Sequence, residues 1–299
     1  MSAPESPAHA TWCFDAIGTS WEIETTEALG PGIRARVTEC IAQFDRVWSR
    51  FREDSLVTSL ARDPREVGAP ADAAEMLDAF VALSAATAGA VNPLVGRSLE
   101  SLGYDAAYSL VDRGAAPAPL EWVDQLTWTG ERMRLTAPAL IDVGALGKGR
   151  LVDLVLAVLS PAVPGDIVVD AGGDMALRGG PVRIGLEHPY DARRAIGVWE
   201  VTDAALCASA TNRRAWGDGL HHVLDARTGR PVTTYAATWA VAATAMRADA
   251  IATALFFDGG VELAHGWGVE WVRMTTDGRV EWSPGCAADL FTGPDIVDV

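Results

Sequence analysis

An acid and a hydroxyl lie four residues apart in the alanine-rich stretch at residues 245–255. The composition of this stretch predicts a helix, on which Asp249 and Thr253 share one face. Most residues around them are small or apolar, so the pair costs free energy unless a partner satisfies it. A hard cation such as Mg²⁺ is one such partner, because it takes oxygen ligands and commonly uses only one or two protein carboxylates. In the alternative interpretation, Asp249 pairs with an arginine or caps a helix, and Thr253 bonds back within its own helix.

A glycine-rich bend that carries a lysine forms the second candidate. The apolar run at residues 139–141 ends in Asp142, and Lys148 lies between the last two of the three glycines that follow. The pattern predicts a strand, a tight turn and a helix N-terminus, whose unpaired N–H groups favour an anion. Lys148 is the only lysine in the chain, and its compact ammonium suits a phosphate. A helix start with one surface lysine is the equal alternative, because the spacing differs from a Walker A motif and Gly149 stands in place of Ser or Thr.

Two adjacent histidines precede a turn sequence, Asp-x-Arg-Thr-Gly, at residues 225–229. On a strand, His221 and His222 would face opposite ways, so at most one of them points into a given site. A histidine in a site is suited to act as a general base near neutral pH. A structural histidine without a chemical role is the alternative.

Three further polar groups carry weaker signals. Asp174 follows two glycines, and it either orients another side chain or closes a turn. Ser209 and Thr211 precede a pair of arginines at residues 213–214, and they either contact a phosphate or lie exposed. The polar cluster at residues 50–55 forms a binding loop or, in the interpretation that we favour, a solvated helix terminus.

Composition excludes several classes of function. The chain has 299 residues and a formal net charge of -16, which argues against a nucleic-acid surface and against binding to an anionic membrane. Four widely spaced cysteines form no C-x-x-C pair, so a zinc site is not expected. We find no H-E-x-x-H, G-x-G-x-x-G or nucleophile elbow, which argues against zinc peptidases, dinucleotide-binding folds and hydrolase triads. The sequence shows no signal peptide and no apolar run long enough to span a bilayer, which favours a reducing cytoplasm.

Helices and strands alternate irregularly along the chain, with several hairpins and no low-complexity linker. This order predicts a single α+β domain over residues 11–299, preceded by a disordered tail at residues 1–10. The apolar periodicity predicts helices at residues 33–48, 71–88, 151–158 and 245–255, and hairpins at residues 126–135 and 271–282. It also predicts a strand at residues 14–24 that is broken at residues 18–19, and strands at residues 139–141, 167–169, 182–186, 197–201 and 239–243.

Five stretches, taken in chain order, resemble motifs of the ApbE family of FAD:protein FMN transferases. No single stretch is decisive, but five in the right order are specific, and the resemblance covers roughly residues 14–257. Residues 49–56 resemble S-x-(Y/F)-x-x-x-S-(E/L), residues 142–149 resemble D-x-G-G-(I/A)-A-K-G, residues 171–174 resemble (N/G)-G-G-D with Ala first, residues 222–231 resemble H-(I/V)-I-D-P-R-T-G-x-P, and residues 244–254 resemble T-A-M-x-A-D-A-L-A-T-A.

The resemblance implies a T-fold-like domain, with mixed or antiparallel sheets and packed helices, that binds FAD as a substrate together with Mg²⁺. The metal would be held by Asp249, Thr253 and the backbone carbonyl of Ala145. Asp142 and Lys148 would contact the FAD.

The implied reaction joins FMN to a target flavoprotein and releases AMP. His222 would lie by the reacting phosphate as the base for the hydroxyl of an acceptor Thr or Ser, and Asp249 would act at the same centre through the metal. Two alternatives stay open: an FAD pyrophosphatase, in which water replaces the acceptor, and a flavin-binding protein without turnover.

Several positions depart from the family pattern, and the resemblance implies that most of them line the flavin or adenine pocket beside Asp142, Lys148 and His222. Ile17 stands where the family usually has Met, and Phe51 where it often has Tyr. The remaining departures are Val91-Asn92 for a Phe-Asp type pair, Leu94 for Thr, Ala210 for Gly and Ala226 for Pro.

Overall fold

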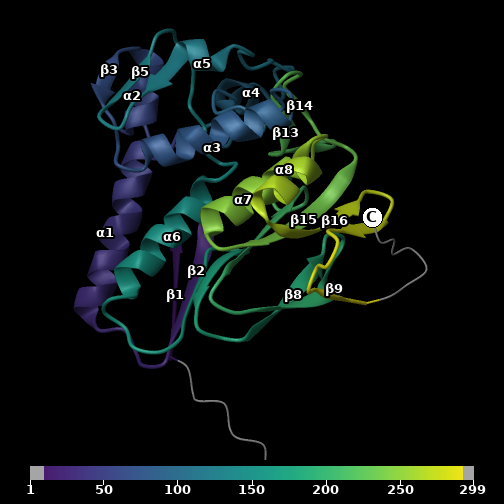
Figure 1. Ribbon diagram of the computed structural model, residues 1–299. Coiled ribbons are helices and arrows are strands. Elements are labelled where there is room, and N and C mark those ends of the chain that lie inside the picture. The colour runs from purple at the N-terminus through teal and green to yellow at the C-terminus, as the bar shows by residue number, and fades with distance from the viewer. Residues whose placement is uncertain (1–9, 292–299) are drawn as a thin grey trace, which may run out of the picture.

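The computed structural model describes residues 10–291, and Figure 1 shows their arrangement. The predicted disordered tail lies outside the described residues except for Ala10, which begins the first strand. Residues 292–299 also lie outside them. Among the described residues, no helix combines the length and the apolar composition that a membrane span needs.

A central antiparallel sheet of eight strands organises the molecule, in the spatial order β1-β2-β6-β7-β10-β15-β16-β17. The first two strands form a hairpin whose turn residues, Ile17 and Gly18, both have positive φ. Such a turn matches the twist of the paired strands. The strands are β1 (Ala10–Ala16), β2 (Thr19–Thr25), β6 (Ile167–Asp170), β7 (Asp174–Arg178), β10 (Ala205–Ala210), β15 (Tyr235–Ala242), β16 (Glu270–Thr275) and β17 (Val280–Trp282).

Helices cover one face of this sheet (Figure 1). They are α1 (Pro31–Trp48), α6 (Gly147–Leu159), α7 (Ala245–Ala254) and α8 (Gly260–Trp267). The proline that opens α1 suits a helix start, because the N–H that it lacks would have no partner there. Val37, Val155 and Ile251 are fully buried against strand residues such as Trp21. This core fixes α6 and α7 side by side.

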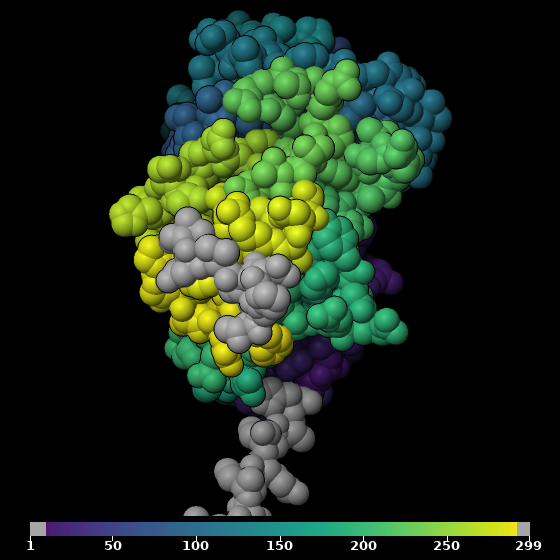
Figure 2. All heavy atoms as spheres, turned by 90° about the vertical axis from the view of Figure 1, so that its right-hand side faces the viewer, coloured from purple at the N-terminus to yellow at the C-terminus, as the bar shows by residue number. Residues whose placement is uncertain are grey.

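A small second sheet covers the opposite face. It consists of β8 (Val182–His188), β9 (Asp191–Val201) and β18 (Asp289–Leu290). Leu186 and Trp199 pack onto Leu206 and Trp239 of the central sheet, so strands β10 and β15 are covered on both faces. On the face shown in Figure 2, the C-terminal strands in yellow lie beside the β8–β9 region and below the lighter green segment that follows β10.

A cap of short elements lies over one end of the helices, at the top of Figure 1. Met76, Phe80 and Trp122 form its core with Met246 and Phe257 from α7 and the turn after it. The cap contains α2 (Leu56–Arg62), α3 (Ala73–Ala86), α4 (Gly96–Ser101), α5 (Trp122–Gln125) and the sheet of β3 (Glu66–Gly68), β4 (Leu126–Trp128) and β5 (Arg132–Leu135). Two short pairs complete the chain: β11 (Ala215–Trp216) with β12 (Leu220–His221), and β13 (Leu224–Asp225) with β14 (Arg230–Pro231).

The predicted α+β class is confirmed, and every strand pairing within residues 10–291 is antiparallel. The predicted strand at residues 139–141 is wrong. Those residues are buried, but their backbone bonds a loop instead of a strand: Gly96 donates to the Leu140 carbonyl, and Asp142 donates to the Pro93 carbonyl. An apolar run this short can be buried in a loop as well as in a strand, so its composition does not distinguish the two.

Candidate functional site

A cavity of about 590 Å³ opens between α1, α6, α7 and the cap. Its volume lies within the range of small-molecule sites. The residues that the sequence analysis predicted for the metal and the base line this one cavity, and so do most of those predicted for the FAD, whereas Leu94 and Ala226 do not line it. Those that line it include Ile17, Phe51, Val91, Asn92, Asp142, Ala145, Lys148, His222, Asp249 and Thr253.

The first turn of α6 packs directly on α7 at the floor of the cavity. Gly149 donates its N–H to Oδ2 of Asp249 at 2.9 Å. A Cβ at residue 149 would lie 2.2 Å from the Ala245 carbonyl oxygen, so only glycine allows this approach. Asp153, one turn further along α6, accepts hydrogen bonds from Ala245 and Met246 at 2.8 and 2.9 Å and so caps α7. The two helices therefore hold Asp249 in a fixed position.

Three oxygen atoms in this region remain available to a cation. The Gly149 N–H goes to Asp249, and no described residue donates a hydrogen bond to the carbonyl of Ala145. Within residues 10–291, the Asp249 side chain accepts only that one hydrogen bond, and the Thr253 hydroxyl makes none. Neither the arginine pair nor the back-bond of the alternative interpretation is present. A carboxylate, a hydroxyl and a free carbonyl are the hard oxygen donors that suit Mg²⁺.

The described residues contain no cluster of three or more His, Cys, Asp or Glu side chains able to hold a metal. A magnesium site of the kind just described does not need one, because substrate phosphates and water complete the coordination of this ion. Burial raises the pKa of Asp249 well above its usual value, and Asp174 adds to this, while Lys148 and the Gly149 N–H oppose it. A divalent cation would relieve the cost of this buried charge.

Lys148 is held by an acid that the sequence left undecided. Its Nζ lies 2.8 Å from Oδ2 of Asp174, whose side chain is fully buried. Burial would lower the pKa of Lys148, but the carboxylates of Asp174 and Asp249 keep it above its usual value. Asp174 therefore orients Lys148, while the turn beside it is closed by Asp170, which accepts from Gly173 at 2.8 Å. Lys148 stays charged and faces the cavity.

His222 lies in a strongly cationic environment. Burial, together with the charges of Arg214 and Lys148, lowers its pKa to about 3, although a contact with the Arg214 backbone opposes the shift. Its Nδ1 has no hydrogen-bond partner. His221 instead bonds the Val232 carbonyl through Nε2 at 2.9 Å and does not line the cavity. Only one of the two histidines faces the cavity, as the strand geometry predicted.

Arg214 and Arg50 also line the cavity, and the sequence analysis assigned neither of them a role in the site. Within the described chain the Arg214 guanidinium has no hydrogen bond or ion pair, and it lines the cavity beside Ser209 and Arg213. Thr211 is not part of this wall. The arginine pair in the sequence was the available signal, but the sequence analysis considered a phosphate contact for Ser209 and Thr211 and gave the arginines no role.

The structure corrects the interpretation of residues 50–55 as a solvated helix terminus at Arg50, whereas Glu53 and Asp54 are exposed beside the start of α2, as predicted. Arg50 is 3% exposed and turns inward, where Nε lies 2.5 Å from Oδ2 of Asp142 and Nη1 donates to the Tyr104 carbonyl at 2.6 Å. The other Asp142 oxygen accepts from Gly144 at 2.7 Å. Asp142 therefore shapes the glycine turn and anchors Arg50 within the wall of the cavity.

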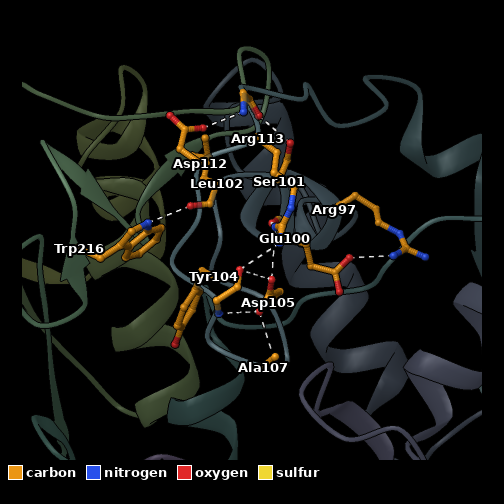
Figure 3. Close-up of polar contacts among 12 residues, drawn as sticks. Arg97, Glu100, Ser101, Leu102, Tyr104, Asp105, Ala107, Asp112, Arg113 and Trp216 are labelled. Atoms are coloured by element: carbon orange, nitrogen blue, oxygen red, sulfur yellow. Dashed lines mark hydrogen bonds and ion pairs between the residues drawn. The ribbon is translucent and has the colours of Figure 1, made fainter.

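An aromatic wall extends the cavity into a second hollow of about 450 Å³. Phe51 stacks on Tyr108 with ring centroids 5.3 Å apart, and Tyr104 stacks on Trp216 at 5.4 Å. Figure 3 shows how this wall is held, with the Trp216 indole N–H reaching the Leu102 carbonyl at 2.8 Å. The loop that follows folds around Asp105, which accepts from Ala107, Ser109 and Arg113.

The departures from the family pattern shape the remaining walls. Asn92 is 2% exposed, and its amide is fully engaged, donating to the Pro119 carbonyl and accepting from Leu94. Val91 is buried beside it, and Ile17 reaches both hollows from the β1–β2 turn. Together the cavity offers hard oxygen ligands, two cations for a phosphate and an apolar aromatic region, which is the set that a dinucleotide requires.

Both the sequence and the fold of this chain match known proteins. The family model described as the ApbE family matches residues 17–270. The FAD:protein FMN transferase of Rhodobacter capsulatus is 28% identical over 322 aligned residues, which cover 97% of this chain and 60% of the relative. The chain thus spans less than two thirds of that relative's length. An FAD:protein FMN transferase of Klebsiella pneumoniae (strain 342) is 24% identical to this chain, and the alignment covers 85% of this chain and 80% of that relative.

Solved structures share the fold. The ApbE protein from Thermotoga maritima superimposes with a TM-score of 0.81 at 24% identity, covering 92% of this chain and 97% of its own. The flavin transferase ApbE from Vibrio cholerae gives a TM-score of 0.77 at 20% identity, with the same coverage. The predicted T-fold-like, single-domain architecture is therefore confirmed.

Proposed function

Because the chain belongs to the ApbE family, we propose that it transfers FMN from FAD to a hydroxyl of a target flavoprotein and releases AMP. The observation that carries this proposal is the single cavity in which Asp249, Thr253 and Ala145 meet Lys148 and His222. Relatives named for this activity in two bacteria support it. FAD is the substrate, and the partner is a protein that presents an acceptor Thr or Ser.

Asp249, the Thr253 hydroxyl and the Ala145 carbonyl would hold Mg²⁺ at the floor of the cavity. Bound there, the ion would neutralise charge that grows on the diphosphate oxygens. Lys148, fixed by Asp174, and Arg214, which has no partner within the described chain, would pair with the phosphates. These residues would bind and orient the diphosphate.

His222 would act as the base. The acceptor oxygen attacks the phosphorus on the FMN side, its proton goes to Nδ1 of His222, and the bond to AMP breaks. The low pKa of His222 comes first from burial and then from Arg214 and Lys148, which repel a further positive charge. Pairing of those cations with the diphosphate would relieve that part of the lowering and make the imidazole a stronger base.

Hydrolysis of FAD to FMN and AMP is the second candidate, because water could reach the same phosphorus through the open second hollow. A flavin-binding protein without turnover is the third.

All four cysteines are free thiols, which suits the proposed location in a reducing cytoplasm.

One incubation separates the three candidates. The protein is mixed with FAD, Mg²⁺ and a candidate acceptor, and flavin fluorescence on a denaturing gel is measured together with free AMP. Flavin that stays on the acceptor with equal AMP supports transfer, whereas AMP with free FMN identifies a pyrophosphatase. Neither product, despite FAD binding, identifies a binding protein and overturns the proposal. Omitting Mg²⁺ and adding EDTA tests the metal in the same assay.

A further inference from the structure

Three large apolar side chains lie exposed in the loop at residues 103–114, which follows α4 in the cap. Tyr108, Leu110 and Val111 are 52%, 49% and 54% exposed. Residues 10–291 expose eight large apolar side chains, and no other three of them lie within four residues of one another in the chain. Neighbouring apolar side chains left in water are typical of a surface that a partner covers.

The 103–114 loop keeps one shape through hydrogen bonds of its own. Asp105 accepts from the Ala107 N–H at 3.1 Å, and the Arg113 N–H donates to the Ser101 carbonyl at 2.8 Å (Figure 3). The Arg113 guanidinium also lies 3.3 Å from the Asp105 carboxylate. Because the loop is already ordered, a partner that docks on it causes little further loss of conformational entropy.

The backbone of this loop is strained at two of the three apolar residues. Tyr108 and Leu110 have φ values of 49° and 52°, a region that bulky side chains rarely adopt. The Leu110 N–H donates to the Gly103 carbonyl at 2.9 Å, and a Cβ at residue 103 would lie 2.3 Å from the Val111 nitrogen. Asparagine or glycine would fit the two strained positions more easily, so the fold does not require apolar side chains there.

The loop borders a route by which a hydroxyl from solvent reaches the reaction centre. Tyr108 and Leu110 line the second hollow, whereas His222 lines the larger cavity. Ile17 and Arg214 line both, so the two hollows are contiguous. The proposed reaction needs a protein to bring its Thr or Ser in from outside, and the second hollow leads from the loop to that centre.

The charges in the second hollow indicate the chemistry of the partner. The charged side chains that line it are Asp45, Arg52 and Arg214. Asp45 and Arg52 pair with each other at 3.1 Å, and the proposed function assigns Arg214 to the diphosphate. With FAD bound, this hollow would keep no unpaired charge, so an apolar segment fits it better than an acidic or a basic one.

We infer that Tyr108, Leu110 and Val111 form a docking surface for an apolar segment of the target flavoprotein, next to the Thr or Ser that receives FMN. The inference rests on the proposed function, and it adds the surface and the segment chemistry by which the partner is recognised. Docking would hold the hydroxyl near His222 and displace water from the mouth of the second hollow, which favours transfer over hydrolysis.

The test uses two short synthetic peptides that each carry one Thr. In the apolar peptide, Leu and Val flank the Thr at a distance of a few residues, and in the polar peptide Asn takes their places. Transfer of FMN at saturating FAD is followed by flavin fluorescence on the separated peptide. We expect the wild type to show a KM about 3- to 10-fold lower for the apolar peptide, because it covers half-exposed side chains.

Val111→Ser and Leu110→Asn remove apolar surface and leave the loop in place. Val111 lines neither hollow, and Asn tolerates the positive φ of residue 110 better than Leu does. Each variant should raise the KM for the apolar peptide about 3- to 10-fold. The KM for the polar peptide, kcat and the affinity for FAD should stay unchanged. A purely structural role would instead lower the melting temperature and kcat, and that result would overturn the inference.

Val123→Ser is the matched control. Val123 lies in α5 of the same cap, is 42% exposed and lines neither hollow. The variant makes the same chemical change as Val111→Ser, and it should leave the KM for both peptides unchanged.

The outcomes separate the inference from the proposed function. Wild-type protein that binds FAD but labels neither the peptides nor any candidate acceptor protein overturns the proposed function. Wild-type protein that labels an acceptor overturns the inference alone if it does not distinguish the two peptides, or if Val111→Ser and Leu110→Asn keep the wild-type KM. A wild-type dimer that Val111→Ser dissociates, measured by light scattering, also overturns the inference, because a second copy of the chain then covers the surface.

Discussion

Gly149 donates its backbone N–H to the carboxylate of Asp249 at 2.9 Å, and this bond joins the first turn of α6 to the middle of α7. One contact thereby has two consequences. It orients the acid, and it leaves the Ala145 carbonyl without the donor that a continuing helix would supply. The proposed metal ligands thus depend on a backbone approach that only glycine permits.

Asp249→Asn should separate metal binding from folding. An amide oxygen still accepts from Gly149, so the fold persists, but the charge that attracts Mg²⁺ is gone. We expect Mg²⁺-dependent turnover to fall by about 100-fold or more, because even residues that only support a ligand contribute 10- to 100-fold. Without metal, the variant should melt at the same or a higher temperature, since it buries no ionised carboxylate. Titration of Mg²⁺ followed by thermal melts measures both effects, and equal stabilisation of variant and wild type by Mg²⁺ would remove Asp249 from the ligand set.

Gly149→Ala should break the junction between α6 and α7. The new methyl group would lie 2.2 Å from the Ala245 carbonyl oxygen and 2.7 Å from Cβ of Asp249. Overpacking of this kind costs about 1–3 kcal/mol, and here it falls on backbone that cannot yield cheaply. Gly266→Ala, in α8, is the matched control because nothing lies within 4 Å of its Cβ. Urea unfolding should show a lower free energy of unfolding for Gly149→Ala and one raised by up to about 1 kcal/mol for Gly266→Ala. Equal stability of the two variants would contradict the close packing at residue 149.

Asp153 should contribute more to α7 than the helix's own N-cap residue does. Asp153 accepts two backbone N–H groups at 2.8 and 2.9 Å, whereas Thr244 accepts one at 3.4 Å in an exposed position. We expect Asp153→Ala to lower the free energy of unfolding by about 1–2 kcal/mol and Thr244→Ala by about 0.5 kcal/mol. Denaturant titration of both variants at one pH measures the difference. A larger loss in Thr244→Ala would show that the contact from α6 is not what caps α7.

Local patterns predicted the elements that carry the site. The four-residue spacing of Asp249 and Thr253 placed them on one helix face, and the glycine spacing placed Lys148 in the first turn of another helix. Both inferences depend only on helical periodicity, which neighbouring residues determine. The hairpins at residues 126–135 and 271–282 were predicted for the same reason, from short-range turn signals.

Contacts between distant residues were beyond such patterns. Arg50 turns inward because Asp142, 92 residues away, receives its guanidinium, and nothing in residues 50–55 encodes that partner. Asp174 holds Lys148 for a similar reason, since β7 lies next to α6 only in the folded chain. The strand prediction for residues 139–141 was wrong for a related reason. Its apolar residues suggested a strand, but the loop at residues 93–96 satisfies its backbone.

His222 should make the folded protein sensitive to mild acid. Burial lowers its pKa to about 3, whereas the unfolded chain keeps a value near 6.5. Below pH 6.5 the His222 imidazole is therefore protonated in the unfolded state, whereas in the folded state it stays neutral down to about pH 3. The stability present above pH 6.5 is lost as the pH falls, and between pH 6.5 and 5 the loss is about 2 kcal/mol.

The variant His222→Gln isolates this contribution, because glutamine does not titrate. Buried carboxyls such as Asp153 and Asp170, whose pKa burial raises, act in the opposite direction, but they are common to both proteins and cancel in the difference. Denaturant unfolding at pH 7.5 and pH 5 should show the wild type losing about 2 kcal/mol more than the variant. Parallel losses would mean that His222 is not held neutral by its surroundings. In that case Arg214 and Lys148 would not be the charges that FAD must pair with to restore the base.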